Sequence, residues 1–293
     1  MKEEEFPRPV CGRIFTREEL NLIRQIIFRN PQATRMQISR EVCLALSWFK
    51  PDGGLKEMSC RVVLLKLHRA GLIQLPPPHR PNNNGRKKKR RTPQGEPQPP
   101  IVRDIQELLP LRIQPVKPGK ELFFWNELID RYHYLGYAPL AGAQIRYMVY
   151  SSFGCLGALS FSAAAWKTMP RDAFIGWTSK QREKNLYLVV NNSRFLILPW
   201  VQVKNLASKI LSLTIQRLPE DWERKYGYRP VLLETFVEKD RFTGTCYKAA
   251  NWIFVGSTRG RGKMDRFGEC KLPVKDIFLY PLTRRFRDIL CRD

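Results

Sequence analysis

Three side chains in this 293-residue chain have the types and surroundings that acid–base or nucleophilic chemistry requires: His133, Glu234 and Tyr247. An imidazole with an ordinary pKa of about 6.5 can exchange a proton near neutral pH. Glu234 lies in the apolar run 231–237, where burial would raise its pKa toward that of a general base. Tyr247 is a candidate acid, or a nucleophile toward a phosphodiester. Each has a structural alternative, namely a hydrogen-bonded histidine, a glutamate paired with an arginine and a tyrosine that anchors a core.

A polar segment interrupts another apolar run and carries candidate substrate-binding residues, Asn191, Asn192 and Arg194. Amide and guanidinium groups are costly to bury without partners, so the segment indicates a function, with Asn192 at a base edge and Arg194 at a phosphate. The alternative is that these residues close a β-bulge. Tyr134 is placed to stack on an extruded base. We expect five residues to line one pocket: His133, Asn192, Arg194, Glu234 and Tyr247.

The composition indicates the class of partner. Lys and Arg number 51 against 27 Asp and Glu, which gives a net charge of +24. Residues 101–293 alone hold 31 Lys and Arg against 18 Asp and Glu, so no short basic tail accounts for the excess. The chain shows no amphipathic basic helix or lipidation motif, and DNA is therefore favoured over an anionic membrane surface as the partner.

Three groups of cations are the expected contacts to the DNA backbone. The first lies on a predicted helix and consists of Arg61, Lys66 and Arg69. The second lies in the basic run 86–91 and the third in the glycine-rich segment 258–266, and their members are Lys87, Lys88, Lys89, Arg90, Arg259, Arg261 and Lys263. The alternatives are a solvated helix face and, for the basic run, plain disorder.

Residues 13–79 predict three helices followed by a short wing. Thr16 begins the first helix with the spacing of a capping box, the second begins near Thr34, and Ser59 is the expected cap of the third. Leu72–Pro76 is expected to form the first strand of the wing. The third helix is expected to bury Val62, Val63 and Leu67. This is the order of a winged helix-turn-helix, which presents a helix to the DNA major groove; a three-helix domain for protein contacts is the alternative.

Residues 80–100 are expected to form an unstructured proline-rich linker, and residues 101–293 a larger domain of mixed class, α+β or α/β. Its expected elements are a helix around 122–132, a hairpin from 144–151 and 155–162, strands 186–190 and 193–198, a helix 203–217, a strand 230–237, a short helix 246–250 and a strand 252–257.

That order of elements resembles the Gcn5-related N-acyltransferases (GNAT). The resemblance implies a helix N-terminus that receives a pyrophosphate, and it places Tyr247 where such enzymes carry a general-acid tyrosine. The segment 199–207 lacks the repeated glycines that bring backbone amides close to a phosphate, which disfavours acyl-coenzyme A as a cofactor. A divalent metal near Glu234, Glu238 and Asp240 is left open.

Motifs at 131–137, 161–166, 190–200, 233–237 and 244–252 resemble those of the DruA family of Druantia anti-phage systems. The resemblance implies a bacterial protein of phage defence or of a mobile element, with other defence proteins, including a helicase, as partners. The segment around His133 is also similar to phage Mom-type DNA modification enzymes. Three functions follow: an enzyme that modifies or processes DNA, a non-catalytic DNA-recognition subunit, and a transposase-like strand-transfer enzyme that uses Tyr247 or a metal at Glu234.

The cysteines, the histidines and the apolar runs exclude several classes of protein. The seven cysteines form no C-x-x-C pair and the three histidines are scattered, so neither a disulfide framework nor a zinc site is expected. Apolar runs such as 195–200 are far shorter than a membrane helix, and the acidic start 1–6 is not a secretory signal. We therefore expect a cytoplasmic protein without membrane contact. A homodimer is left open.

Overall fold

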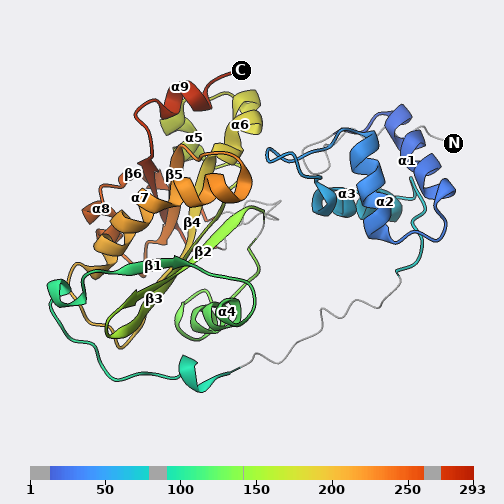
Figure 1. Ribbon diagram of the computed structural model, residues 1–293. Coiled ribbons are helices and arrows are strands. Elements are labelled where there is room, and N and C mark those ends of the chain that lie inside the picture. Colours follow the sequence, from blue (N-terminus) through green and yellow to red (C-terminus); the bar gives the residue numbers. More distant parts are fainter. Residues whose placement is uncertain (1–13, 79–90, 141, 261–271) are drawn as a thin grey trace. The chain divides into compact units, whose positions relative to one another are not determined.

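The computed structural model describes residues 14–78, 91–140, 142–260 and 272–293 (Figure 1). The chain divides into two compact units, Met1–Lys88 and Lys89–Asp293, each with its own buried core. Among the helices of the described residues, none combines the length and the apolar character that crossing a bilayer requires.

The N-terminal unit contains three helices, α1 (Arg17–Arg29), α2 (Arg35–Ala45) and α3 (Glu57–Arg69). The predicted starts of the first two are confirmed, because Thr16 and Thr34 each cap their helix through a capping box. The inward faces of the helices form one core, whose members include Ile23, Ile38, Val42, Cys60, Val63, Leu64 and Leu67.

The third helix differs from its prediction. It begins after Lys56, and Ser59 lies inside it, so the assignment of Ser59 as its cap is wrong. Val62, which was expected to point inward, is 45% exposed. The buried positions run from Cys60 to Leu67 with the i, i+3, i+4, i+7 spacing of one helix face, and Val62 lies off that stripe.

The strand expected at Leu72–Pro76 is absent, and within the described part of this unit no wing is formed. Arg24 Nε donates to Leu72 O at 2.9 Å and Arg35 Nε donates to Pro76 O at 3.0 Å, so side chains of α1 and α2 hold the segment. The prolines at 76–78 have no N–H to donate to a ladder. The three helices are confirmed and the strand at 72–76 is not.

The C-terminal unit is built on one seven-stranded sheet, which confirms the expected mixed α/β class. The strand order is β1-β2-β3-β4-β5-β7-β6, and of these neighbouring pairs β4 with β5 is the parallel one. These two strands pair at Val189–Asn192 and Leu232–Thr235; beyond that, β4 continues along β3 and β5 along β7. The strands are β1 (Arg112–Pro115), β2 (Gln144–Ser151), β3 (Gly154–Ala163), β4 (Val189–Ile197), β5 (Leu232–Glu238), β6 (Ile253–Ser257) and β7 (Lys275–Pro281).

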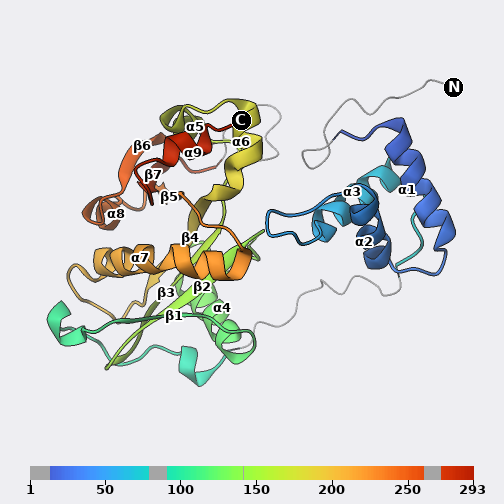
Figure 2. The ribbon, with the colours of Figure 1, turned by 45° about the horizontal axis from the view of Figure 1, so that its top comes forward.

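Two helices, α4 (Lys120–Tyr132) and α7 (Leu206–Tyr226), cover opposite faces of the sheet (Figure 1, Figure 2). The guanidinium of Arg146 in β2 lies 5.1 Å from the ring centroid of Trp125 in α4, whereas the hydroxyl of Tyr147 donates to Asp221 of α7 at 3.0 Å. Adjacent strand residues point to opposite faces, which we call the α4 face and the α7 face. The remaining helices are η1 (Pro93–Gly95), η2 (Ile105–Leu108), α5 (Met169–Ile175), α6 (Ser179–Asn185), η3 (Leu186–Leu188), α8 (Thr245–Ala249) and α9 (Phe286–Leu290).

The predicted boundaries of β4 and α7 are corrected. Residues 189–197 form one strand, because the polar segment is accommodated by a register shift at Ser193, a β-bulge, rather than by a break. The long helix continues to Tyr226 with Pro219 in its interior, since the buried Leu218 and Trp222 pack it onto the sheet beyond the proline. No sequence pattern predicted β1, β7, α5, α6 or α9.

Residues 91–100, which were expected to belong to an unstructured linker, pack against the C-terminal unit. The carboxylate of Glu127 in α4 accepts hydrogen bonds from the backbone N and the hydroxyl of Thr92, both at 2.8 Å. Tyr132 donates to Gly95 O at 2.8 Å, and Arg131 pairs with Glu127. One buried carboxylate therefore fixes this stretch to α4.

We expect Glu127→Ala to lower the free energy of unfolding of the C-terminal unit by about 2–4 kcal/mol, because the donors of Thr92 and Arg131 lose their shared acceptor. Amide hydrogen exchange at residues 92–96 should accelerate in the same variant. Glu220→Ala removes a carboxylate whose side chain is 72% exposed and is the matched control. Unchanged exchange at 92–96 would contradict the assignment.

Candidate functional site

Asn192 and Tyr247 meet on the α7 face. Asn192 is the register partner of Thr235 in β5, and Tyr247 of α8 donates its hydroxyl proton to Asn192 Oδ1 at 2.7 Å. The other register partner of Asn192 is Phe161, whose ring packs against Tyr147 of the same face. Because Arg194 and Glu234 lie on the other face, the five residues expected in one pocket are separated by the sheet.

Tyr247 is held inside the core. Its ring packs against those of Phe195, Trp252 and Phe278, and the side chain is 7% exposed. Burial raises the pKa of Tyr247 above its ordinary value. A buried phenol that donates its proton to an amide oxygen corresponds to the structural alternative, a tyrosine that anchors the core.

Glu234 is paired with a buried arginine. Its Oε2 accepts from Arg171 Nη1 at 2.8 Å and its Oε1 from the backbone N of Ala165 at 2.8 Å, and the Glu234 and Arg171 side chains are both 0% exposed. Burial raises the pKa of Glu234, and the charge of Arg171 opposes that shift. Arg171 also pairs with Asp172 at 2.8 Å. This is the arginine pairing that the sequence left as the alternative to a general base.

On the α4 face, His133 lies beside Arg194. His133 is the C-cap of α4, and Leu135 N donates to its Nδ1 at 3.2 Å. Arg194 donates from Nη1 to Ser193 O at 2.7 Å and from Nε to Gly136 O at 3.4 Å. Burial, and then the charge of Arg194, lower the pKa of His133 to about 4. The imidazole is therefore neutral near pH 7, with Nδ1 as acceptor and the hydrogen on Nε2.

Aromatic rings extend this site to the turn after β5. The Tyr134 ring stacks on His133 with centroids 4.9 Å apart and meets Phe242 edge-on at 5.2 Å. The guanidinium of Arg241 lies 5.1 Å from the Tyr134 centroid. Sequence reasoning missed Arg241 and Phe242, which carry no signal beyond an aromatic residue beside a cation. We call His133, Tyr134, Arg194, Arg241 and Phe242 the aromatic–basic cluster.

The other predicted contacts lie elsewhere. On α3, Lys66 and Arg69 are exposed, and Arg61 donates to the sulfur of Met58. Arg259 is exposed just after β6, and Asn191 Oδ1 is buried on β4 without a hydrogen-bond partner in the described structure. The predicted contacts that fall outside the described residues are Lys87, Lys88, Lys89, Arg90, Arg261 and Lys263.

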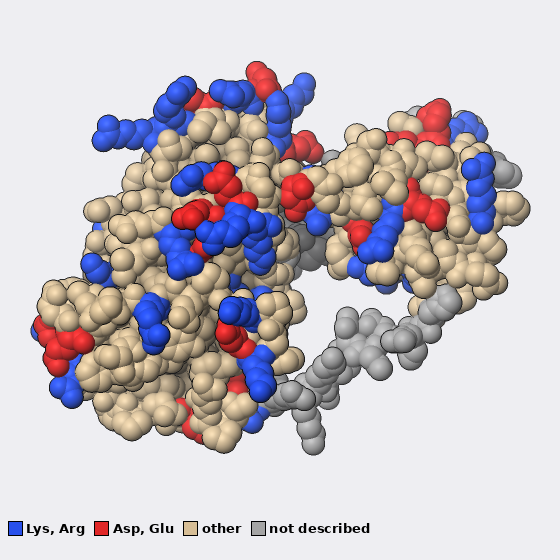
Figure 3. Space-filling model, viewed as in Figure 1, with Lys and Arg blue, Asp and Glu red and all other residues tan. Residues whose placement is uncertain are grey.

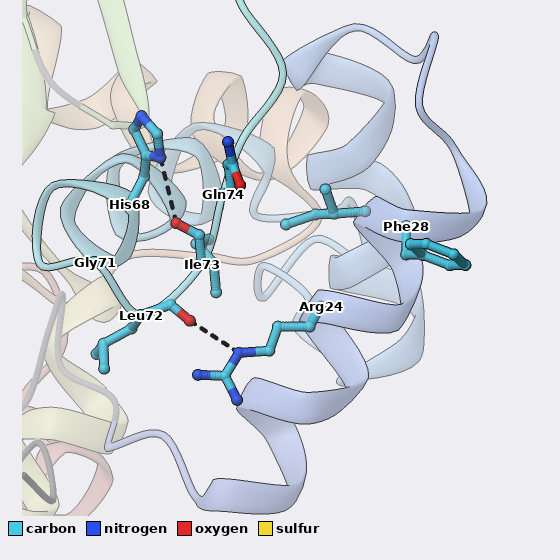
Figure 4. A pocket seen from close by; sticks show the side chains of 8 residues that line it. Arg24, Phe28, His68, Gly71, Leu72, Ile73 and Gln74 are labelled. Atoms are coloured by element: carbon cyan, nitrogen blue, oxygen red, sulfur yellow. Dashed lines mark hydrogen bonds between the residues drawn. The ribbon is translucent and has the colours of Figure 1, made fainter. Parts of the chain in front are cut away.

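A pocket of about 700 Å³ opens in the N-terminal unit between α1 and residues 71–74 (Figure 4). Arg24 reaches across it to Leu72 O, and Phe28 on its rim is 86% exposed. None of the predicted site residues lines this pocket. In the part of the chain that the structure describes, no three His, Cys, Asp or Glu side chains gather to hold a metal ion.

A second pocket, of about 250 Å³, lies at the first turns of α7, where the acyltransferase resemblance would place a pyrophosphate. Lys209 is the cation among its lining residues, beside Asn205, Ser208 and Ser212.

The chain matches the family model described as Druantia protein DruA over residues 66–271. Among solved structures it is similar to a Salmonella typhimurium protein assigned as an acetyltransferase and determined with acetyl-CoA, at 15% identity and a TM-score of 0.31, over 48% of this chain and 66% of that one. It is also similar to an N-acetyltransferase from Staphylococcus aureus, at 10% identity and a TM-score of 0.34, over 59% and 97% of the two chains. The ribosomal-protein-S18-alanine N-acetyltransferase from Escherichia coli has 8% identity and a TM-score of 0.36, over 59% and 94%. No curated protein matches the chain.

We expect Glu234→Gln to lower the free energy of unfolding by about 3 kcal/mol or more, because Arg171 then keeps a buried charge without its full counter-charge. Glu238→Gln, on the same strand at a partly exposed ion pair, is the control and should change stability little. The double change of Arg171→Met with Glu234→Leu should recover most of the loss, since a buried ion pair can be replaced by apolar groups. A Glu234→Gln chain as stable as the wild type would show that the carboxyl is already neutral.

The lowered pKa of His133 predicts the direction in which folding stability changes with pH. Its folded pKa of about 4 lies below the ordinary value near 6.5, so the unfolded chain takes up a proton that the folded chain refuses. This contribution to stability is complete above about pH 6.5 and is lost as the pH falls toward about 4. His133→Gln should therefore narrow the difference in Tm between about pH 7.5 and about pH 5. A His133→Gln chain whose difference in Tm equals that of the wild type would contradict the assignment.

Proposed function

Since the chain belongs to the DruA family, we propose that it binds DNA in an anti-phage system and holds a nucleotide of that DNA at the aromatic–basic cluster. The observation that carries the proposal is the composition of the cluster. Tyr134 and Phe242 are 36% and 46% exposed, and Arg194 stands beside them with Arg241, which is paired with Glu238 at 3.3 Å. Exposed rings on which bases stack, combined with cations for phosphates, are how proteins bind single-stranded nucleic acid.

The surrounding charge supports the same partner. The chain has a net charge of +24, and Lys and Arg side chains are spread over the visible face of the C-terminal unit (Figure 3). A polyanion gains affinity from each phosphate that such side chains neutralise. The exposed Lys66 and Arg69 on α3 add cations in the N-terminal unit, where we propose a further contact to duplex DNA.

The positions of the candidate catalytic groups favour recognition over strand transfer. Tyr247 and Glu234 are both buried and already bonded within the protein, so neither side chain is presented to a phosphodiester. His133 is the candidate that belongs to the cluster, and its neutral imidazole offers an N–H donor. We therefore propose that the C-terminal unit recognises DNA, with His133 as the group on which any modification chemistry would depend.

Tyr134→Ala should weaken binding of a fluorescent single-stranded oligonucleotide by about 10-fold at low salt, because one stacking partner is lost. Tyr187→Ala removes a tyrosine of similar exposure, 38%, from η3, where its ring packs against Tyr228, and is the matched control. Fluorescence anisotropy over a salt series measures both affinities. A wild-type chain that retains no DNA at low ionic strength, or two variants that bind alike, would contradict the proposal.

A further inference from the structure

Polar side chains cross the middle of the sheet on its α4 face. In one row, Arg146 of β2, Ser160 of β3 and Arg194 of β4 are direct register partners. Direct partners point to the same side of a sheet, and the stacking of Arg146 on Trp125 identifies that side as the α4 face. With strands about 4.8 Å apart, the Cα atoms of the two arginines are about 10 Å apart, so their long side chains can reach one ligand.

A second row, two residues further along the strands, is also polar and consists of Gln144, Ser162 and Asn191. The side-chain oxygens of Gln144 and Asn191 are buried without a hydrogen-bond partner in the described structure, and so is Nε of Arg146. Buried polar atoms in proteins are nearly always paired. Three unpaired polar atoms on one patch are therefore available to bond a ligand.

The two arginines also lack counter-charges. Arg171 in the same unit is neutralised by Glu234 and Asp172, whereas neither Arg146 nor Arg194 pairs with a carboxylate in the described part of the chain. Burial lowers the pKa of both guanidiniums. A half-buried positive charge without a partner costs free energy, and two of them in one row favour an anion.

We propose that Arg146 and Arg194 form a binding site for a phosphate group. A guanidinium presents paired N–H donors that match phosphate oxygens, and it is weakly hydrated, which suits a half-buried site. The orphan amide oxygens of Gln144 and Asn191 accept N–H donors of the kind that a nucleobase carries. The inference rests on the proposed function in one respect, namely that the phosphate belongs to a nucleotide of DNA. A free nucleotide or inorganic phosphate offers the same chemistry.

The first test compares R146Q and R194Q with R112Q, which removes an exposed arginine from β1 of the same sheet. Inorganic phosphate should raise the Tm of the full-length wild type and of R112Q relative to sodium chloride at equal ionic strength. The two site variants should lose about 10-fold or more in apparent phosphate affinity. Without phosphate the Tm of each site variant should stay close to that of the wild type, because removing an uncompensated charge offsets the lost contacts of Arg194 with Ser193 O and Gly136 O and of Arg146 with Trp125. An arginine with a purely structural role would instead give a lower Tm and an unchanged phosphate response.

Single-stranded DNA identifies the source of the phosphate. If both variants also weaken DNA binding about 10-fold and reduce the slope of log K against log salt by about one, the phosphate belongs to DNA. If the phosphate response is lost while DNA binding is unchanged, the site takes a free phosphate or nucleotide, and the inference stands. A wild-type chain that responds to phosphate but does not bind DNA contradicts the proposed function alone. Variants that respond to phosphate like R112Q overturn the site.

Discussion

The extra residue in β4 decides which side chains can act together. In a regular strand Asn192 and Arg194, two residues apart, would point to the same face of the sheet. The bulge at Ser193 breaks that alternation, so Asn192 faces Tyr247 on the α7 side while Arg194 faces His133 on the α4 side. A bulge and a functional segment were alternative interpretations of these residues. In the structure the bulge is present, and it is the means by which Arg194 joins the aromatic–basic cluster.

In one region of the C-terminal unit the buried charges are paired with each other, and in another region they have no counter-charge in the part of the chain that the structure describes. Where α5 meets β5, Arg171 and Glu234 neutralise each other out of contact with water. On the α4 face, Arg146 and Arg194 are half-buried, and neither pairs with a carboxylate of the described residues. Folding stability alone does not favour such an arrangement, because an unpaired charge is costly to desolvate. Local features that oppose stability are expected at functional sites. Here the destabilising feature is the pair of unpaired arginines, Arg146 and Arg194, rather than the buried Glu234.

The sequence predicted the structure correctly where the deciding residues are close together in the chain. The predictions failed where contacts between residues far apart in the chain determine the structure. The capping box at Thr16 contains all the groups it needs within four residues, whereas Ser59 has the right residue type but lies inside α3, which begins at Glu57 without a side-chain cap. Glu234 was recognised as buried from its apolar neighbours, but its partner Arg171 is 63 residues away and no periodicity indicates it. Arg146 could have been found by the argument that found Arg194, because it too interrupts an apolar strand.

A phosphate at Arg194 would also change the chemistry of His133. Two causes keep that imidazole neutral, its burial and the nearby guanidinium. An anion beside Arg194 cancels the second cause and favours the protonated ring. Phosphate binding and proton uptake are then linked, so a falling pH weakens the unliganded fold and strengthens the complex through the same group. His133 is therefore coupled to the phosphate site, because the charge of its imidazole depends on whether a phosphate is bound at Arg194.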